Sequence, residues 1–216
     1  NPAVRQALYD AANFWLDKGV GGFRIDAITY IKKPAVFEDG PADAADGTAN
    51  VHAVTANTPG ILDFLREFRR KVFDGHDIFT VGEANGVSSE ELKDWVGEKG
   101  VFNMLFEFSH SMLGMGDTEM WCRPAEWQLT DLKQALNDSQ RATAQNGWYP
   151  IFFENHDQRR SLNHFFPRPV QDTVHAAKAL ATLLFTLRGT PFVYEGEELG
   201  YANMALDSIE EYDDIS

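Results

Sequence analysis

Gly22-Phe23-Arg24-Ile25-Asp26-Ala27 is a short apolar segment with two charges near its end. Its Phe and Ile are typical of a buried strand, and Asp26 follows where that strand is expected to end. Arg24 and Asp26 are two residues apart, so a strand points their side chains to the same side. We expect the guanidinium to keep the Asp26 carboxylate ionised, as a nucleophile must be. A structural ion pair explains this segment, taken alone, equally well.

Helix-like and strand-like segments alternate along the chain. Apolar spacing predicts helices at about residues 2–18, 58–72, 130–145 and 170–187. The first has Val4, Leu8, Ala11, Ala12 and Trp15 on its apolar face. Ser88 and Glu91 form a capping-box pattern that predicts a further helix after them.

Strands are predicted at about residues 22–26, 78–81, 101–108, 149–153 and 191–194. Residues 34–57 are rich in Pro, Gly, Asp, Ala and Asn, which indicates a long surface loop. Helices that alternate with nearly continuous apolar strands indicate a parallel sheet covered by helices.

Composition and charge narrow the class of protein. Apolar residues make up 44% and charged residues 24%, as in ordinary globular proteins, and no apolar run approaches the ~20 residues of a membrane span. The net charge of −14 argues against nucleic acid as a partner, because phosphates would be repelled. Cys122 is the only cysteine, so we expect no internal disulfide and a reducing cytoplasm. Because residue 1 is Asn, we also expect a piece of a longer protein.

Acidic residues recur directly after the predicted strands. Asp26, Glu83, Glu107, Asp157 and the Glu195–Glu198 group share this placement. In a parallel barrel these positions meet at one rim, where active sites are built. One ionised and one protonated carboxylate on either side of a bond are the minimum for retaining glycoside hydrolysis.

Other chemistries fit the sequence less well. Glu154, His156 and Asp157 could be metal ligands, but adjacent strand residues face opposite ways and no second cluster has a zinc spacing. His156 could also be a core histidine. No Gly-x-Gly-x-x-Gly, phosphate-binding loop or Gly-x-Ser-x-Gly elbow is present. We therefore expect no metal and no cofactor, and we expect Trp121 and Trp127 to be core residues.

Three segments resemble the α-amylase superfamily of glycoside hydrolases, specifically its oligo-1,6-glucosidase and α-glucosidase branch. They are Gly22–Ala27, Thr80–Val87 and Phe153–Arg160, in the family's order. The resemblance implies an α/β fold, a (β/α)8 TIM barrel of which residues 1–216 form about the fourth to eighth βα units. They would be the C-terminal part of the catalytic barrel domain. The implied partner is the rest of the same polypeptide, with the missing strands, an inserted domain and a C-terminal β domain.

The resemblance also implies roles for single residues. Asp26 would be the nucleophile, Glu83 the acid/base, and Asp157 the third catalytic carboxylate, which grips sugar hydroxyls. The implied substrate-binding residues are Arg24, His156, Arg160, Ala27 and Asn85. The chain departs from the family at Arg159, where Pro is usual.

The implied activity is that of a retaining α-glucosidase that releases terminal glucose from short oligosaccharides or disaccharides. In the branch that the chain resembles, Ala or Thr after the nucleophile accompanies α-1,4 cleavage and Val accompanies α-1,6 cleavage. Ala27 therefore implies a preference for α-1,4 bonds. An oligo-1,6-glucosidase and a sucrose- or trehalose-type transglycosylase are the alternatives. A non-catalytic relative of the transporter heavy chains would lack part of the carboxylate triad. A barrel that only binds sugar stays open, because fold alone does not fix function.

Overall fold

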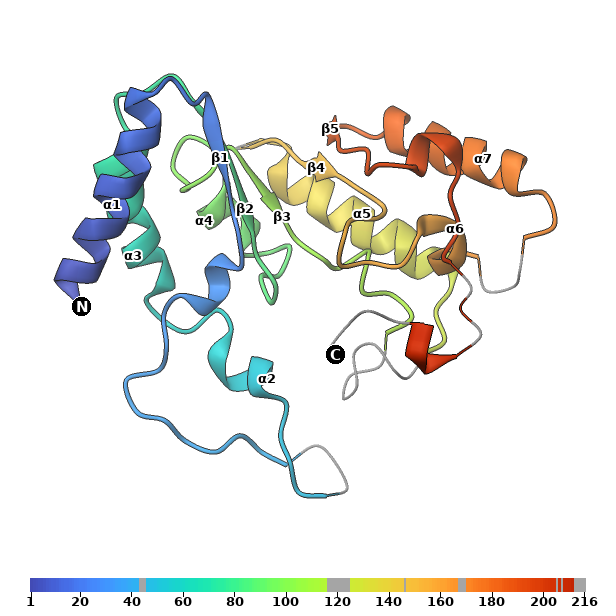
Figure 1. The fold of residues 1–216 in the computed structure, drawn as a ribbon, viewed down its shortest axis with the longest axis horizontal. Helices are drawn as coiled ribbons and strands as arrows, with labels where there is room; N and C mark the ends of the chain where they lie inside the picture. The colour runs from blue at the N-terminus through green and yellow to red at the C-terminus, as the bar shows by residue number, and fades with distance from the viewer. Residues whose placement is uncertain are drawn as a thin grey trace. The chain divides into compact units, whose positions relative to one another are not determined.

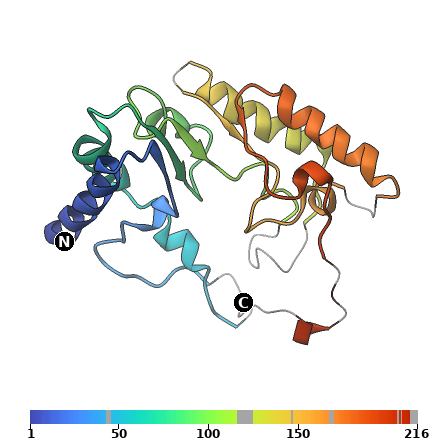
Figure 2. The ribbon, with the colours of Figure 1, turned by 45° about the horizontal axis from the view of Figure 1, so that its top comes forward.

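The computed structural model describes residues 1–42, 46–115, 125–145, 147–166, 170–204, 206 and 208–211. The chain divides into two compact units, Asn1–Pro150 and Ile151–Ser216. Figure 1 labels their elements, and Figure 2 shows the same ribbon from a second direction. Trp121 and Cys122, a predicted core residue and the single cysteine, lie outside the described residues.

The first unit contains a parallel three-stranded sheet in the order β1-β2-β3. Its strands are β1 (Gly22–Ile25), β2 (Phe79–Glu83) and β3 (Met104–Phe106). Ile25 pairs with Gly82, and Gly82 pairs in turn with Leu105. The predicted parallel arrangement is thus confirmed for these strands, which lie next to one another in Figure 1.

The main helices of this unit lie where the apolar spacing predicts them. They are α1 (Pro2–Asp17), α3 (Ile61–Phe68), which continues into a π-helical turn η2 (Arg69–Phe73), and α5 (Leu129–Thr143). Asn1 caps α1 by accepting a hydrogen bond from the backbone N–H of Ala3 at 2.9 Å. Figure 1 shows α1 beside α3, where Arg5 and Glu67 form an ion pair of 3.3 Å.

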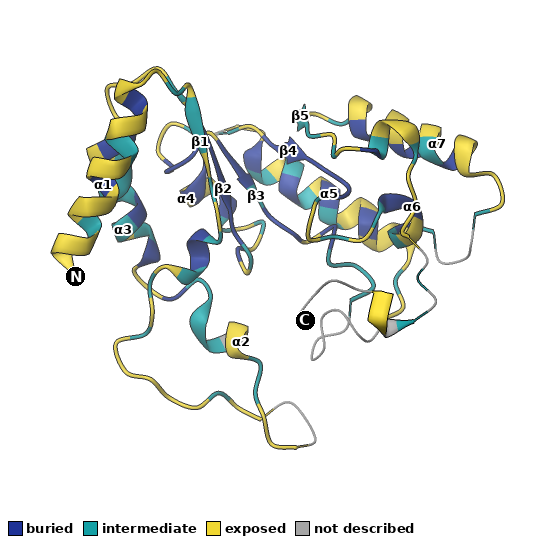
Figure 3. Ribbon diagram, in the orientation of Figure 1, coloured by how far each residue is buried: buried dark blue, intermediate teal, exposed yellow. Residues whose placement is uncertain are grey.

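Large apolar side chains form one core in this unit. Ile28, Leu92, Trp95, Phe102 and Leu105 are each at most 1% exposed. Figure 3 shows the buried residues concentrated on β2 and β3 and on the helix faces turned toward them. This packing holds the carboxyl ends of β1 and β2 in place.

Three local expectations are wrong. Residues 34–57 are not a loop throughout, because they include α2 (Val51–Thr55). The carboxylate of Glu91 does accept hydrogen bonds from Ser88, from N at 2.9 Å and from Oγ at 2.8 Å. The helix predicted after this pair is present as α4 (Leu92–Trp95), but the pair does not cap it, because α4 begins only after Glu91.

The third concerns the apolar face expected for α1. Val4, Leu8 and Trp15 are 54–59% exposed, whereas Tyr9 and Leu16 are buried in the core of the unit. The side of α1 that packs against the core of this unit is therefore not the side that the apolar spacing predicts.

The second unit contains short strands and two α-helices. Its sheet joins β4 (Pro150–Ile151) to β5 (Thr190–Pro191), and both strands are shorter than predicted. The helices are α6 (Ser161–His164) and α7 (Thr173–Thr186), followed by the 3-10 turns η3 (Glu197–Leu199) and η4 (Ile209–Glu211). Asp172 caps α7 by accepting from the His175 N–H at 3.0 Å. In the part of the chain described, no helix has the length and apolar character needed to cross a membrane.

Gly22 allows β1 and β2 to come together. Its φ is +157°, and a Cβ at this position would overlap the backbone carbonyl oxygen of Phe79 on the paired strand. The neighbouring Gly21 has nothing within 4 Å of the corresponding position. Only the second glycine is thus required by close packing.

Gly22→Ala should therefore weaken the β1–β2 pairing. We expect it to lower the free energy of unfolding of the whole protein by about 3 kcal/mol, as overpacking against rigid neighbours does. The matched control Gly21→Ala should change it by less than about 1 kcal/mol. Urea unfolding of the three proteins measures both values, and equal losses for the two variants would contradict this account.

Candidate active site

Arg24 joins two carboxylates at the carboxyl ends of β1 and β2. The register pairs Ile25 with Gly82, so Asp26 follows β1 opposite Glu83, the last residue of β2. Arg24 donates from Nη1 to Asp26 Oδ1 and from Nη2 to Glu83 Oε2, the latter at 2.6 Å. The structure thus brings together three of the predicted site residues.

The two carboxylates differ in their environment. The side chain of Asp26 is 72% exposed, whereas that of Glu83 is 10% exposed. Burial raises the pKa of Glu83 above its ordinary value, and a hydrogen bond with Asp26 raises it further. The Ala27 N–H and Arg24 act in the opposite direction without outweighing these effects. Glu83 is therefore suited to hold a proton, while Asp26 lies open to a ligand.

Ala27 contributes to the site through its backbone. Its φ of 45° and ψ of 39° are left-handed, which is uncommon for a residue other than glycine. The backbone N–H of Ala27 donates to Glu83 Oε2 at 3.3 Å. Such local strain is found at functional sites, where the surrounding structure maintains it. Asn85, which follows β2 by two residues, is half-buried.

Tyr30 is a neighbour of the site that the sequence did not indicate. It ends the 3-10 turn η1 (Ile28–Tyr30) directly after Ala27. Burial and then the negative charge of Glu83 raise the pKa of Tyr30, so its hydroxyl stays protonated. Its only sequence signal was its place shortly after a strand end.

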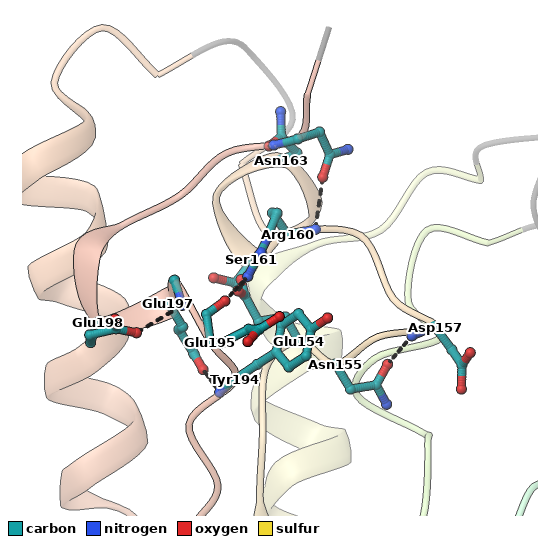
Figure 4. Close-up of polar contacts among 12 residues, drawn as sticks. Glu154, Asn155, Asp157, Arg160, Ser161, Asn163, Tyr194, Glu195, Glu197 and Glu198 are labelled. Carbon is teal, nitrogen blue, oxygen red and sulfur yellow. Dashed lines mark hydrogen bonds and ion pairs between the residues drawn. The ribbon is translucent and has the colours of Figure 1, made fainter. Parts of the chain in front are cut away.

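In the second unit, His156 and Asp157 lie together on an exposed loop after β4. His156 Nε2 is 3.2 Å from Asp157 Oδ2, and both side chains are more than half exposed. The loop is shaped by Asn155, whose Oδ1 accepts from the Asp157 N–H at 2.8 Å (Figure 4). The two predicted substrate-binding groups are thus neighbours that are open to solvent.

Arg160 is held by contacts within this unit. Its Nη1 donates to Glu154 Oε1 at 2.8 Å and to the carbonyl oxygen of Glu195 at 2.7 Å. Its guanidinium lies over the ring of Tyr194, 4.8 Å from the ring centre. Figure 4 shows Arg160 between these groups. These contacts give Arg160 a structural task in addition to the predicted contact with substrate.

Glu154 does not join His156 and Asp157 in a cluster of metal ligands. It is 2% exposed, and its oxygens accept from Arg160 and from the Ser161 N–H at 2.5 Å. Its carboxylate is thus used inside the unit, whereas the side chains of His156 and Asp157 are exposed. Over the described residues, no group of three or more His, Cys, Asp or Glu is arranged to hold a metal ion.

The acidic group after β5 is largely engaged with its own backbone. Glu197 Oε2 accepts from the Tyr194 N–H at 3.0 Å, and Glu198 Oε2 accepts from the Gly196 N–H at 2.9 Å. Glu197 also lines a cavity of about 130 Å³ against the apolar side of α7. Burial raises the pKa of Glu197 to about 7.

Glu107 is a structural residue and not a carboxylate at the site. Glu83 pairs with Phe106, the last residue of β3, so Glu107, which follows it, points to the other side of the sheet. There Glu107 is 1% exposed and accepts from Ser139 Oγ at 2.8 Å and Tyr149 OH at 2.5 Å. Although burial opposes it, hydrogen bonds and the charge of His110 lower the pKa of Glu107 to about 2.

The ionised Glu107 should stabilise the fold in a pH-dependent way. Because its folded pKa lies below the ordinary value of 4.5, the stabilisation is complete above that value and is lost as the pH falls toward 2. Between pH 6 and pH 3 the wild type should lose about 2 kcal/mol more unfolding free energy than Glu107→Gln. Urea unfolding at the two pH values measures this difference.

Glu67→Gln is the matched control, because Glu67 forms a partly exposed ion pair with Arg5. The unfolding free energy of Glu67→Gln should stay within about 1 kcal/mol of the wild-type value at both pH values. If Glu107→Gln follows the wild type as closely, Glu107 is not the acid-sensitive group.

Comparison with known proteins agrees along the whole chain. A family model described as "Alpha amylase, catalytic domain" matches residues 1–215. The chain is 43% identical over 217 aligned residues to a probable oligo-1,6-glucosidase 3 of Bacillus subtilis (strain 168). That alignment covers all of this chain and 38% of the relative.

Solved structures give the same result. An isomaltulose synthase from Erwinia rhapontici NX5 is 36% identical, with a TM-score of 0.88 over 99% of this chain and 38% of its own. A trehalose-6-phosphate hydrolase from Bacillus licheniformis is 34% identical, with a TM-score of 0.82 over 100% of this chain and 38% of its own. The chain thus spans 38% of the length of each of these proteins.

Proposed function

Since this chain belongs to the α-amylase catalytic-domain family, we propose that it is part of a retaining α-glucosidase. Its fold is a partial (β/α)8 barrel, as predicted. Within the whole protein, we assign residues 1–216 to the C-terminal part of the catalytic barrel domain, at about the fourth to eighth βα units.

The observation that carries the proposal is the bridge made by Arg24. One guanidinium holds an exposed carboxylate and a buried carboxylate with raised pKa side by side. Retaining glycosidases need this difference between two carboxyl groups about 5–5.5 Å apart. A purely structural ion pair would not need the pKa of the second carboxylate to be raised.

The chemistry we propose is a double displacement. Protonated Glu83 donates its proton to the glycosidic oxygen while Asp26 attacks the anomeric carbon and the bond to the leaving sugar breaks. Glu83, now ionised, takes a proton from water, which attacks the glycosyl–Asp26 ester and releases glucose with retained configuration. Arg24, freed of one negative charge when Asp26 becomes an ester, still holds Glu83.

Four further residues are proposed to bind the substrate. We assign Asp157 and His156 to hydroxyl groups of the sugar, an interaction that would strengthen in the transition state. Their exposed, adjacent side chains suit that task. We also retain Arg160 and Asn85 as substrate-binding residues, Arg160 with the structural contacts described above.

The proposed substrates are short α-glucosides, with α-1,4 bonds favoured over α-1,6. The support for this preference is the small side chain of Ala27 next to the nucleophile. The names of the relatives favour a second candidate, an oligo-1,6-glucosidase. An isomerase-type transglycosylase is the third, since one structural neighbour is an isomaltulose synthase.

The rest of the same polypeptide is the proposed main partner of this chain. Several large apolar side chains on α1 and α7 are 52–62% exposed. They are Leu8, Phe14, Trp15 and Phe185. Neighbouring helices of the complete barrel would cover such surfaces, because the helices of a (β/α)8 barrel pack beside one another in an outer ring. A cytoplasmic location also stays a prediction, based on the single cysteine.

Two variants of the full-length protein test the roles of the carboxylates. Glu83→Gln should lower kcat on maltose by about 10²–10⁴-fold, because the leaving group is no longer protonated. With p-nitrophenyl α-glucoside, which needs little protonation, it should show a burst of nitrophenol followed by slow turnover. Asp26→Asn should show neither burst nor turnover, because no glycosyl–enzyme forms.

The matched control is Asp46→Asn, an exposed carboxylate whose hydrogen bonds are to Thr48. Its kcat on maltose and its release of nitrophenol should match those of the wild type. Proton NMR of the glucose first released from p-nitrophenyl α-glucoside should show the α-anomer with the wild type, and initial release of the β-anomer would overturn the retaining assignment. Products from maltose, isomaltose, sucrose and trehalose separate the three candidate activities.

Ala27→Val tests the linkage preference. The branched side chain should crowd the acceptor sugar of an α-1,4 bond and lower kcat/KM on maltose relative to isomaltose by about 10–200-fold. Steady-state kinetics on both disaccharides give this ratio. A ratio that stays constant, or that moves toward maltose, contradicts the α-1,4 assignment.

Ala27→Thr is its matched control. Thr has the shape of Val, and both β-branched residues are strained at the left-handed φ of 45°. A loss of stability shared by the two variants therefore reports backbone strain. A fall in the maltose ratio shared by Thr and Val reports the size of the branch, and a fall confined to Val reports its apolar character.

A further inference from the structure

Asn57 lies between the two loops that carry the candidate catalytic carboxylates. It follows α2 and has a φ of 47°. Its backbone N–H donates to the carbonyl oxygen of Thr29 at 2.9 Å. Its side-chain Nδ2 donates to the carbonyl oxygen of Gly86 at 3.3 Å and to Glu91 Oε1 at 3.0 Å.

These bonds connect equivalent points of the two loops. Thr29 is the third residue after Asp26, and Gly86 is the third residue after Glu83. One residue thus contacts both loops at the same distance along the chain from each carboxylate. The first loop has a second anchor beside it, since Thr58 Oγ1 donates to the carbonyl oxygen of Lys32 at 2.8 Å.

The chemistry of asparagine suits this position. Asparagine tolerates the left-handed region better than other residues with a Cβ, and this backbone directs its N–H to one loop and its amide to the other. Its acceptor on the second loop is also fixed, because Ser88 donates to Glu91 Oε2 from N at 2.9 Å and from Oγ at 2.8 Å. Aspartate or leucine would lack the donor.

We propose that Asn57 is a positioning residue that fixes the loop bearing Asp26 against the loop bearing Glu83. The proposal rests on the function proposed above for these two carboxylates. Asn57 touches neither of them in the contacts described. It acts through Thr29 and Gly86, and so determines how closely the nucleophile and the acid/base approach each other.

Asn57→Gly in the full-length enzyme tests this role. Glycine keeps the left-handed backbone and the bond to Thr29 but removes the bridge to Gly86 and Glu91. Small displacements of reacting groups cost up to 10²-fold in rate, so we expect kcat on the preferred disaccharide to fall by about 10-fold or more. KM should change by less than about twofold, because ground-state binding is retained.

The pH profile supplies a readout that a simple loss of stability would not move. Arg24, Asp26 and Tyr30 are the charged or titratable groups that act on Glu83. If the loops separate, Glu83 gains water and loses its hydrogen bond with Asp26, so its pKa falls. The basic limb of kcat/KM, along which activity falls as Glu83 ionises, should then move to lower pH.

Asn13→Ala is the matched control. Its side-chain Nδ2 also donates to a backbone carbonyl of another segment, Lys71 at 3.1 Å, but away from the two carboxylates. We expect Asn13→Ala to leave kcat and the pH of the basic limb of kcat/KM unchanged. If Asn57→Gly also keeps both, or if Asn13→Ala shifts the limb equally, the positioning role is overturned.

A wild type inactive on every α-glucoside would refute the proposed function and not the positioning role. In that case carboxyl ¹³C NMR titration of Glu83 decides the role without turnover. A lower pKa of Glu83 in Asn57→Gly than in wild type and Asn13→Ala supports the role. An unchanged value overturns it.

Discussion

The guanidinium of Arg24 is the contact on which the site in the first unit depends. Two carboxylates brought together repel each other, and one of them must then hold a proton or both must share a cation. Here Arg24 donates to both Asp26 and Glu83, and burial raises the pKa of Glu83. A lysine, with its single point of charge, would not reach two acceptors with the same fixed geometry.

This contact depends in turn on how the strands pair. Arg24 belongs to β1 and Glu83 to β2, so one residue of slip would turn one of them to the other face of the sheet. The register is set where the backbones approach most closely, at Gly22 and Phe79, and where Ile28, Leu105 and Phe102 surround Gly82. The chemistry of the pair therefore relies on residues without any polar group.

The sequence predicted features that depend on residues close together in the chain, but not those that depend on how the strands pair. The two-residue spacing of Arg24 and Asp26 predicted their contact, and helical periodicity placed α1, α5 and α7 within a few residues of their observed ends. Glu107 looked like Glu83 in sequence, and only the β2–β3 register shows that it points the other way. The Ser88–Glu91 pattern formed its bonds but in a turn, because a capping box has the same spacing as such a turn. Asn57 gave no signal, since its contacts with Thr29, Gly86 and Glu91 are 28, 29 and 34 residues away.

The backbone and the side chain of Ala27 contact different parts of the site. Its backbone N–H bonds to Glu83, whereas only its methyl group differs from what another residue would present to a ligand. Substitution at this position therefore alters the shape next to Asp26, the proposed nucleophile, while the amide that faces Glu83, the proposed acid/base, remains in the chain. In evolutionary terms, if the proposed roles hold, a lineage reaches new side-chain shapes at Ala27 by single codon changes without altering the contacts of Arg24 with Asp26 and Glu83, at the expense only of backbone strain.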